Sequence, residues 1–413
     1  MINYKKFTLK NGLTLLVHRD SSSPIAVLNL LYKVGSRDEN PEKTGFAHLF
    51  EHLMFSGSKN VKSFDNELQM VGGENNAFTC NDYTNYYITL PKENIETALW
   101  IESDRMLYPN ITQKNLDTQR SVVIEEFNQR YLNKPYGDIW LLLRPLAYKT
   151  HPYQWATIGK NVEHIQNATL ADVKQFFDLH YSPSNAIMSI VADIEPEKIY
   201  ELVEKWFGDI PDRPKSLHKI SKELQQTELR TLTVERDVPS SCLYKAYKMC
   251  NRHDKDYYVC DLMTDILSSG RSSRMYQHLL KDMNLFSSVN AFISGDADEG
   301  LVIVTAHLLP QVDMKVAEAA IDAEIEKICT TNVSEHELEK VKNKIESSQI
   351  FAETSIMNKA MLLGYYEMLG RMDLINSEPD YYRAITAEDI KRVAKNVFKN
   401  EQCSTLYYKT KNI

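Results

Sequence analysis

The chain has 413 residues, which is too long for one ordinary hydrophobic core and predicts two domains of about 200 residues. Hydrophobic residues make up 43% and charged residues 25%, which is the balance of a soluble globular protein. The net charge of −8 argues against nucleic acid or an anionic membrane as the main partner, because neither attracts a net anion.

The cysteines and the N-terminus bear on the compartment. Six cysteines are scattered without a C-x-x-C pair, which indicates neither a disulfide framework nor a thiolate zinc site. The first residues contain no apolar segment of signal-peptide length, and no stretch of about 18 apolar residues follows. We therefore expect a cytoplasmic protein without a membrane span, or a periplasmic one if the chain is a processed form.

Strand and helix patterns alternate along the first part of the chain. Residues 7–20 predict a hairpin that turns at Asn11-Gly12, and residues 25–36 a buried strand. A helix that carries residues 48–52 follows. Residues 64–91 then predict a short helix, a break at two glycines, and one strand rich in Thr and Tyr.

Two long amphipathic helices are predicted at 94–107 and 116–132, and a further buried strand at 185–194. Residues 208–226 contain prolines and many charges without a strong period, which indicates a linker between domains.

The two halves of the chain end on similar segments, residues 169–191 and 386–408. Both read T-x-x-D-[VI]-K, with a Thr that caps a helix and an Asp three residues later that reinforces the cap. Their positions favour duplication of one α+β domain. We expect homologous domains at 1–215 and 228–413, joined by a linker at 216–227.

The segment "GFAHLFEHLMFSGS" carries the pattern H-x-x-E-H with His48, Glu51 and His52. On an α-helix the two histidines lie roughly 40° apart, so both imidazoles can reach one metal ion. Glu51 lies on the flank of the same face and can act on a water molecule without being a ligand. The alternative is an amphipathic core helix whose histidines form only its polar edge.

A catalytic zinc site needs a third protein ligand, and Glu125 and Glu126 are the candidates. Helical phase directs Glu125 away from the apolar stripe, so we expect it to be solvated. Glu126 lies at the edge of that stripe, where either a salt bridge or a metal ion would satisfy its carboxylate.

The H-x-x-E-H pattern, "VVIEE" at 122–126 and "NKPYG" at 133–137 together resemble the pitrilysin or M16 family of zinc metallopeptidases, which are inverzincins. The resemblance extends over most of the chain. It implies an α+β fold of two homologous domains, each a mostly antiparallel sheet backed by helices, of the LuxS/MPP-like metallohydrolase type. The second domain would be an inactive copy of the first.

Carried over residue by residue, the resemblance implies one zinc ion per chain, with His48, His52 and Glu126 as ligands and Glu51 as general base. The implied activity is that of a zinc-dependent endopeptidase. Zinc would polarise the scissile carbonyl and activate the attacking water. A non-catalytic assembly or binding subunit of the same family is the alternative.

The segment "NNAFTCNDYTNYY" resembles the edge strand on which the family binds substrate, a peptide or unfolded segment in extended form. This resemblance implies backbone contacts at Asn76 and Ala77, with Tyr86 flanking the site. The alternative is an ordinary strand, in which Tyr86 and Tyr87 point to opposite faces. His151 is either a neighbour of the metal site or a structural histidine.

Three positions depart from the family pattern. Gln119 stands where some members have a Glu, and Leu280 and Ser287 stand where many have an Arg and a Tyr that hold the substrate. We therefore expect a dimer, either of identical chains or with a second M16 subunit that supplies the Arg and the Tyr.

Overall fold

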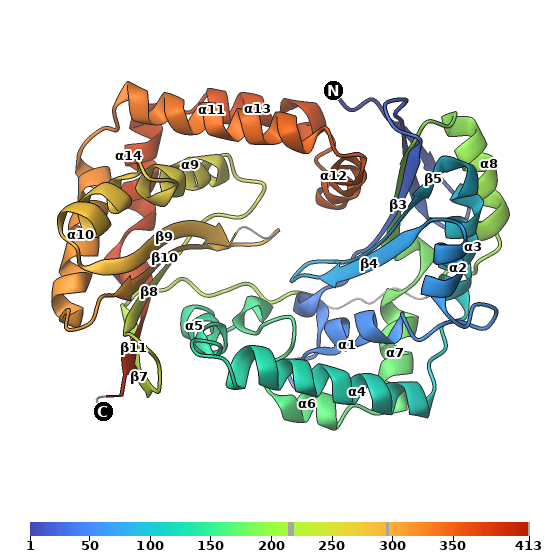
Figure 1. The fold of residues 1–413 in the computed structure, drawn as a ribbon, viewed down its shortest axis with the longest axis horizontal. Helices are drawn as coiled ribbons and strands as arrows, with labels where there is room; N and C mark the ends of the chain where they lie inside the picture. Colours follow the sequence, from blue (N-terminus) through green and yellow to red (C-terminus); the bar gives the residue numbers. More distant parts are fainter. Residues whose placement is uncertain (214–218, 295–296, 412–413) are drawn as a thin grey trace. The chain divides into compact units, whose positions relative to one another are not determined.

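The computed structural model describes residues 1–213, 219–294 and 297–411. The chain forms two compact units, each built on a mixed sheet with helices on both faces (Figure 1). Unit 1 comprises Met1–Gln129, Trp155–Ile220 and Ile350–Asn376. Unit 2 comprises Arg130–Gln154, Ser221–Gln349 and Ser377–Ile413.

The sheet of unit 1 has the strand order β1-β2-β6-β3-β5-β4. Neighbouring strands are antiparallel except β2 and β6, which are parallel. The order leaves β4 at one edge. The strands are β1 (Lys5–Thr8), β2 (Thr14–Arg19), β3 (Ile25–Tyr32), β4 (Glu74–Thr79), β5 (Thr84–Pro91) and β6 (Ala186–Ala192).

Most strand predictions for this unit are confirmed, with one correction. The chain turns between β1 and β2 at Gly12, whose φ of 87° favours glycine, and β3 is buried as its apolar run indicates. The single strand predicted within 64–91 is wrong, because this region forms the hairpin β4–β5. Asn81 and Asp82 reverse the chain there, and the Cys80 N–H donates to the Tyr83 carbonyl at 3.0 Å.

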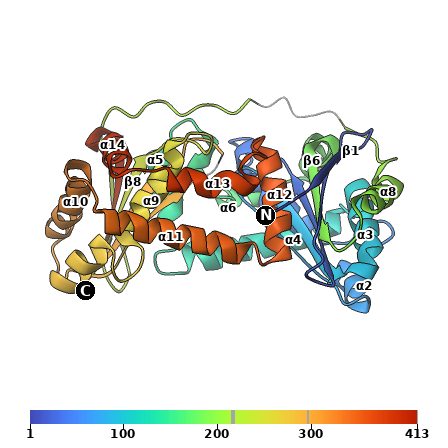
Figure 2. The ribbon, with the colours of Figure 1, turned by 90° about the horizontal axis from the view of Figure 1, so that it is seen from above.

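Helices cover both faces of this sheet. In Figures 1 and 2, α3 and α8 lie on one face and α12 on the other. The helices of unit 1 are α1 (Phe46–Leu53), α2 (Phe64–Met70), α3 (Ile95–Leu107), α4 (Gln113–Phe127), α6 (Val162–Gln166), α7 (Leu170–His180), α8 (Pro196–Phe207) and α12 (Ile356–Leu369).

A buried polar chain joins α12 to the sheet. Asn85 on β5 donates to the Asn29 Oδ1 atom at 2.5 Å, and Asn29 on β3 donates to the Ser189 hydroxyl at 3.1 Å. Ser189 on β6 donates in turn to the Ala360 carbonyl of α12 at 2.6 Å. A Cβ at Gly364 would approach the Asn29 amide nitrogen to 3.1 Å, so glycine allows the close packing of this helix.

The sheet of unit 2 repeats this topology with β7 (Arg230–Arg236), β8 (Cys242–Lys248), β9 (Phe286–Ser294), β10 (Leu301–Leu308) and β11 (Cys403–Thr410). The order is β7-β11-β8-β10-β9, and β7 and β11 form its parallel pair. The equivalent places in unit 1 hold β2-β6-β3-β5-β4. Both predicted capping boxes, Thr169 with Asp172 and Thr386 with Asp389, are present. Topology and caps therefore agree with a duplicated α+β domain.

The compact units do not follow the predicted ranges 1–215 and 228–413. In unit 2, α5 (Ile139–Ala147) from the first half of the chain packs on one face of the sheet. The other face is covered by α9 (Asp256–Ser268), α10 (Met314–Thr330) and α14 (Ala387–Val397). Unit 1 receives α12 from the second half, so each half contributes one helix to the other unit. The remaining helices are α11 (Glu335–Ala352) and α13 (Leu374–Arg383).

The segment between α8 and β7 agrees with a linker, since its described residues, 208–213 and 219–229, form neither helix nor strand. Residues 216–218 of the predicted linker lie outside the described residues.

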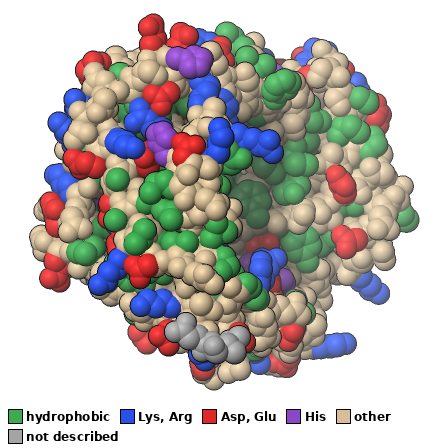
Figure 3. All heavy atoms as spheres, turned by 60° about the vertical axis from the view of Figure 1, so that its left-hand side comes forward, with side chains coloured by type: hydrophobic (Ala, Val, Ile, Leu, Met, Phe, Trp, Pro, Cys, Tyr) green, Lys and Arg blue, Asp and Glu red, His purple; other side chains and the backbone are tan. Residues whose placement is uncertain are grey.

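No helix in the described part of the chain has the length and apolarity needed to span a membrane. On the face drawn in Figure 3, acidic and basic side chains are interspersed, and no large patch of one sign appears.

Lys248, at the end of β8, is a buried amine in unit 2. Its Nζ atom is enclosed and has no hydrogen-bond partner among the described residues, and it lies 3.5 Å from the centre of the Tyr148 ring. Burial lowers the pKa of Lys248 from 10.5 to about 7. Between these pH values the native state therefore binds fewer protons than the unfolded state. The free energy of unfolding decreases as the pH falls from about 10 toward 7.

We predict that Lys248→Met raises the free energy of unfolding at pH 7 by on the order of 3 kcal/mol, because each pKa unit corresponds to about 1.4 kcal/mol. The gain shrinks as the pH approaches 10. Chemical denaturation at several pH values measures it, with the exposed Lys409 on the same sheet changed to Met as the control. A gain that did not depend on pH would contradict the assignment of a neutral, buried amine.

Candidate metal centre

The predicted H-x-x-E-H helix is α1, and its phase separates core residues from site residues. Leu49, Phe50 and Leu53 are buried, and the Phe50 ring lies 4.2 Å from that of Tyr181 between centroids. His48 and His52 are only partly buried on another side of the helix. The helix is amphipathic, and its two histidines lie outside the buried face, as a metal site would require.

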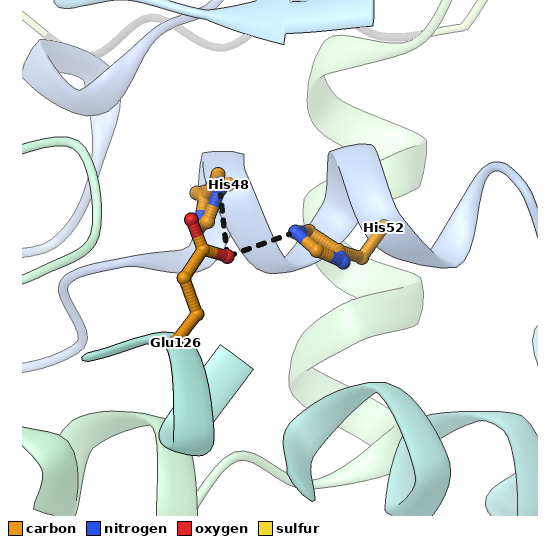
Figure 4. A group of neighbouring side chains, drawn as sticks. All are labelled: His48, His52 and Glu126. Carbon is orange, nitrogen blue, oxygen red and sulfur yellow. Dashed lines mark ion pairs between the residues drawn. The ribbon is translucent and has the colours of Figure 1, made fainter. Parts of the chain in front are cut away.

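Glu126 lies on α4, which packs against α1. Thr112 caps α4, and the buried stripe of Leu116, Val123 and Phe127 fixes its rotation. That rotation exposes Glu125, as the sequence predicts, and its carboxylate accepts a hydrogen bond from Gln129. Glu126 is partly buried and faces α1 (Figure 4).

The three candidate ligands converge on one point. The Glu126 Oε2 atom lies 3.7 Å from the His48 Nε2 atom and 3.4 Å from the His52 Nε2 atom (Figure 4). A tetrahedral zinc ion with ligands at about 2.0–2.2 Å separates its ligand atoms by about 3.3–3.6 Å. The 3.4 Å distance lies within this range and the 3.7 Å distance lies just above it. Two imidazoles with one carboxylate form a donor set of the catalytic type. Among the described residues, this is the one group of three or more His, Cys, Asp or Glu that could hold a metal ion.

Glu51 lies beside this group but is held by a different neighbour. The Thr79 hydroxyl donates to the Glu51 Oε2 atom at 2.6 Å. Thr79 is the last residue of β4, and its hydroxyl lies 3.4 Å from that of Thr84 on β5. The hydrogen bond fixes the orientation of the Glu51 carboxylate. Sequence reasoning missed Thr79, because nothing in the pattern N-A-F-T indicates which side chain contacts α1.

The strand β4 presents a free edge to solvent. The Ala77 backbone N–H donates to the Asn76 side chain at 2.8 Å. In an antiparallel pair, alternate residues point their backbone groups away from the partner strand, so Ala77 faces the open edge although it stands opposite Tyr86 on β5. The edge available for pairing thus ends at the residue that contacts Glu51.

Comparison with known proteins identifies the family. Residues 14–137 match the family described as insulinase (peptidase family M16), and residues 167–345 match the peptidase M16 inactive domain. The zinc protease PqqE of Helicobacter pylori is 31% identical over 412 residues, covering 98% of this chain and 93% of that protein. The chain belongs to peptidase family M16.

Solved structures agree with this membership and with the two-domain α+β fold. The crystal structure of a protease from Helicobacter pylori has a TM-score of 0.93 at 30% identity and covers 99% of this chain and 100% of that one. A structure from Pseudomonas fluorescens, described as a peptidase M16 inactive domain, shares the fold with a TM-score of 0.89 at 18% identity. It covers 100% of this chain and 98% of that one.

Tyr86, which the M16 resemblance implies to flank the site, is a core residue. Its side chain is 0% exposed, packed in the core with its hydroxyl 3.3 Å from that of Tyr181, and burial raises its pKa well above 10. The side chain stands on the covered face of β5, so direct contact with a substrate would require the core to open. That Tyr86 flanks the site stays a prediction, and the Glu51 carboxylate is among the charges that act on its hydroxyl.

The other positions singled out from the sequence lie elsewhere. His151 is buried in unit 2, where its Nδ1 atom accepts a hydrogen bond from the Tyr153 N–H at 3.1 Å, which agrees with the structural alternative. Leu280 packs against the core of unit 2, and Ser287 is exposed on β9. Gln119 is partly exposed on α4.

We predict that Glu126→Ala weakens zinc binding by roughly 100-fold or more, because the loss of a direct ligand exceeds the 10- to 100-fold loss typical of outer-shell partners. The neighbouring variant Glu125→Ala should bind zinc as the wild type does. Competition with a chromophoric chelator measures both affinities. Equal losses in the two variants would remove Glu126 from the ligand set.

Proposed function

We propose that this M16 protein is a zinc-dependent endopeptidase that cleaves peptides or unfolded segments bound as an extended strand. One observation carries the proposal: the donor atoms of two imidazoles and one carboxylate lie within 4.8 Å of one another, and Glu51 is the residue next to His52 on the same helix. The names of relatives, such as zinc protease PqqE, support zinc as the metal.

In this proposal His48, His52 and Glu126 hold one zinc ion, and three protein ligands leave a position for water or substrate. When bound, zinc polarises the scissile carbonyl and lowers the pKa of water toward about 7. Glu51 takes the proton from the attacking water and passes it to the leaving amine. Thr79 keeps the Glu51 carboxylate turned toward that water through its hydrogen bond.

The edge of β4 would hold the substrate. An extended peptide that pairs with the open side of Ala77 continues the sheet by one strand, and main-chain hydrogen bonds supply affinity without requiring a particular side chain. The Ala77 N–H donates to the Asn76 side chain, and this hydrogen bond would break when the peptide binds. Because β4 ends at Thr79, this pairing carries the peptide toward Glu51.

The proposal is tested by digestion of a peptide library with the wild type and with Glu51→Gln, each analysed for zinc. We expect zinc in both proteins and loss of cleavage by at least 100-fold in the variant, because the amide cannot accept the proton. Equal cleavage by both would exclude Glu51 as the base. Zinc without cleavage in the wild type, alone or with a partner, would favour the non-catalytic alternative.

We predict that Ala77→Pro raises KM for peptides about tenfold or more. Proline removes the N–H at the open edge, and edge strands tolerate it because that group does not bond to β5. Ala77→Val keeps the N–H and should leave KM near the wild-type value. Steady-state kinetics on one peptide compares the variants. An unchanged KM in the proline variant would contradict pairing at this position.

A second subunit is part of the proposal. Leu280 and Ser287 offer neither the guanidinium nor the phenol that many M16 members use on the substrate, so a partner of the same family, in a homodimer or heterodimer, would supply them. Full activity of the isolated monomer would count against this requirement. The cytoplasmic location stays a prediction.

A further inference from the structure

The buried side chain of Glu39 forms hydrogen bonds with the N-terminus of α1, the helix that carries His48 and His52. Its side chain is 1% exposed, and it follows the short helix η1 (Ser36–Asp38). Its two oxygens accept hydrogen bonds from the backbone N–H groups of Gly45 at 2.9 Å and Ala47 at 2.8 Å. Glu39 therefore bonds the N-terminus of α1 from six residues upstream of the helix cap.

These hydrogen bonds supply acceptors that the N-terminus of α1 lacks. The first N–H groups of any α-helix lack partners within the helix, and a side chain at the N-cap position normally supplies one. Gly45 occupies that position here and has no side chain to do so. Glycine is required, because its φ is 88° and a Cβ would lie 2.6 Å from the Ile158 carbonyl oxygen. Glu39 supplies the missing acceptors.

The segment that carries Glu39 is itself fixed. The Trp155 indole N–H donates to the Ser36 carbonyl at 2.9 Å, and the Asp38 side chain accepts a hydrogen bond from the Gly35 N–H at 2.9 Å. A carboxylate this deeply buried costs free energy unless it is hydrogen-bonded. Burial raises the pKa of Glu39 to about 8, against the opposing effect of the two N–H groups. A neutral amide keeps the size of this side chain and one of its two acceptors, while its NH2 group would face the other N–H.

The consequence for the site follows from the position of His48. α1 has eight residues, and His48 is the third of them, directly after Ala47, so it lies in the turn that Glu39 holds. His52 lies in the last turn and is held by the packing of Leu49 and Leu53. Loss of the Glu39 contacts would loosen the first turn, where helices fray, and displace His48 more than His52.

We propose that Glu39 is a positioning residue that clamps the first turn of α1 and thereby sets the place of the His48 imidazole in the metal centre. The inference rests on the proposed zinc site. The competing possibility is that Glu39 serves only the stability of unit 1 and leaves the metal centre unaffected.

The test uses the full chain with Co²⁺ as a spectroscopic probe in place of zinc. Glu39→Leu keeps the volume but removes both acceptors, Glu39→Gln keeps one, and Glu42→Gln changes an exposed residue of the same loop. Visible absorption gives the Co²⁺ affinity and the ligand-field spectrum, and circular dichroism gives the Tm of the metal-free proteins. Kinetics on the zinc proteins gives kcat and KM.

We expect Glu39→Leu to weaken Co²⁺ binding about 10- to 100-fold, the range of outer-shell partners, and to alter the visible spectrum. Its kcat should fall with KM nearly unchanged, because the edge of β4 is untouched. Glu39→Gln should restore affinity to within about fivefold, and Glu42→Gln should match the wild type. In a His48→Ala background, Glu39→Leu should have little further effect on Co²⁺ affinity, because Glu39 acts through His48.

A lower Tm with wild-type Co²⁺ affinity and spectrum in Glu39→Leu would overturn the inference, since it would assign Glu39 to stability alone. If Glu39→Leu does not fold, Glu39→Asp, which is too short to reach both N–H groups, decides by the same two readouts. Failure of the wild type to bind Co²⁺ would remove the zinc centre itself, and with it this inference. If the wild type binds Co²⁺ and only the Glu39 variants change in affinity or spectrum, the result concerns the role of Glu39 and leaves the proposed zinc site intact.

Discussion

The chemistry of this protein depends on where one short helix begins. A shift of α1 by a single residue would rotate it by about 100°. In one direction His48 and His52 would take the buried places of Leu49 and Leu53, and in the other direction these leucines would take the places of the histidines. Hydrophobic packing fixes the rotation, and the contacts at Gly45 and Glu39 fix the first residue. The distances of 3.4 and 3.7 Å to Glu126 are the outcome of both constraints. Neither constraint is supplied by the metal-site residues themselves.

In the proposed mechanism, the strand β4 links substrate binding to catalysis. Its open side would offer main-chain groups to a peptide, and the side chain of its last residue donates a hydrogen bond to the proposed base. A strand at a sheet edge is usually an aggregation risk, which proteins reduce with short length and polar residues. β4 has only six residues, among them Glu74, Asn75 and Asn76, so the exposed edge is short and polar.

The sequence predicted the features that depend on local periodicity. The helix with H-x-x-E-H, the separation of Glu125 from Glu126, and the two capped helices all follow from positions along one helix. The sequence left open which face of a strand is covered and which distant segments touch. Whether Tyr86 or Tyr87 is covered depends on which helices pack on each side of the sheet, and α12, more than 250 residues away in the chain, is one of them. Thr79 and Glu39 were missed because each acts on a helix in a separate segment.

The exchange of helices between units has a consequence for how the protein can be divided. A cut in the segment between α8 and β7 would leave the N-terminal fragment with α5 but without α12, and the C-terminal fragment with α12 but without α5. In each fragment one sheet face would lose the helix that covers it, exposing apolar side chains and, on β6, the Ser189 hydroxyl that donates to α12. We therefore expect each half expressed alone to be less stable than the same half within the full chain.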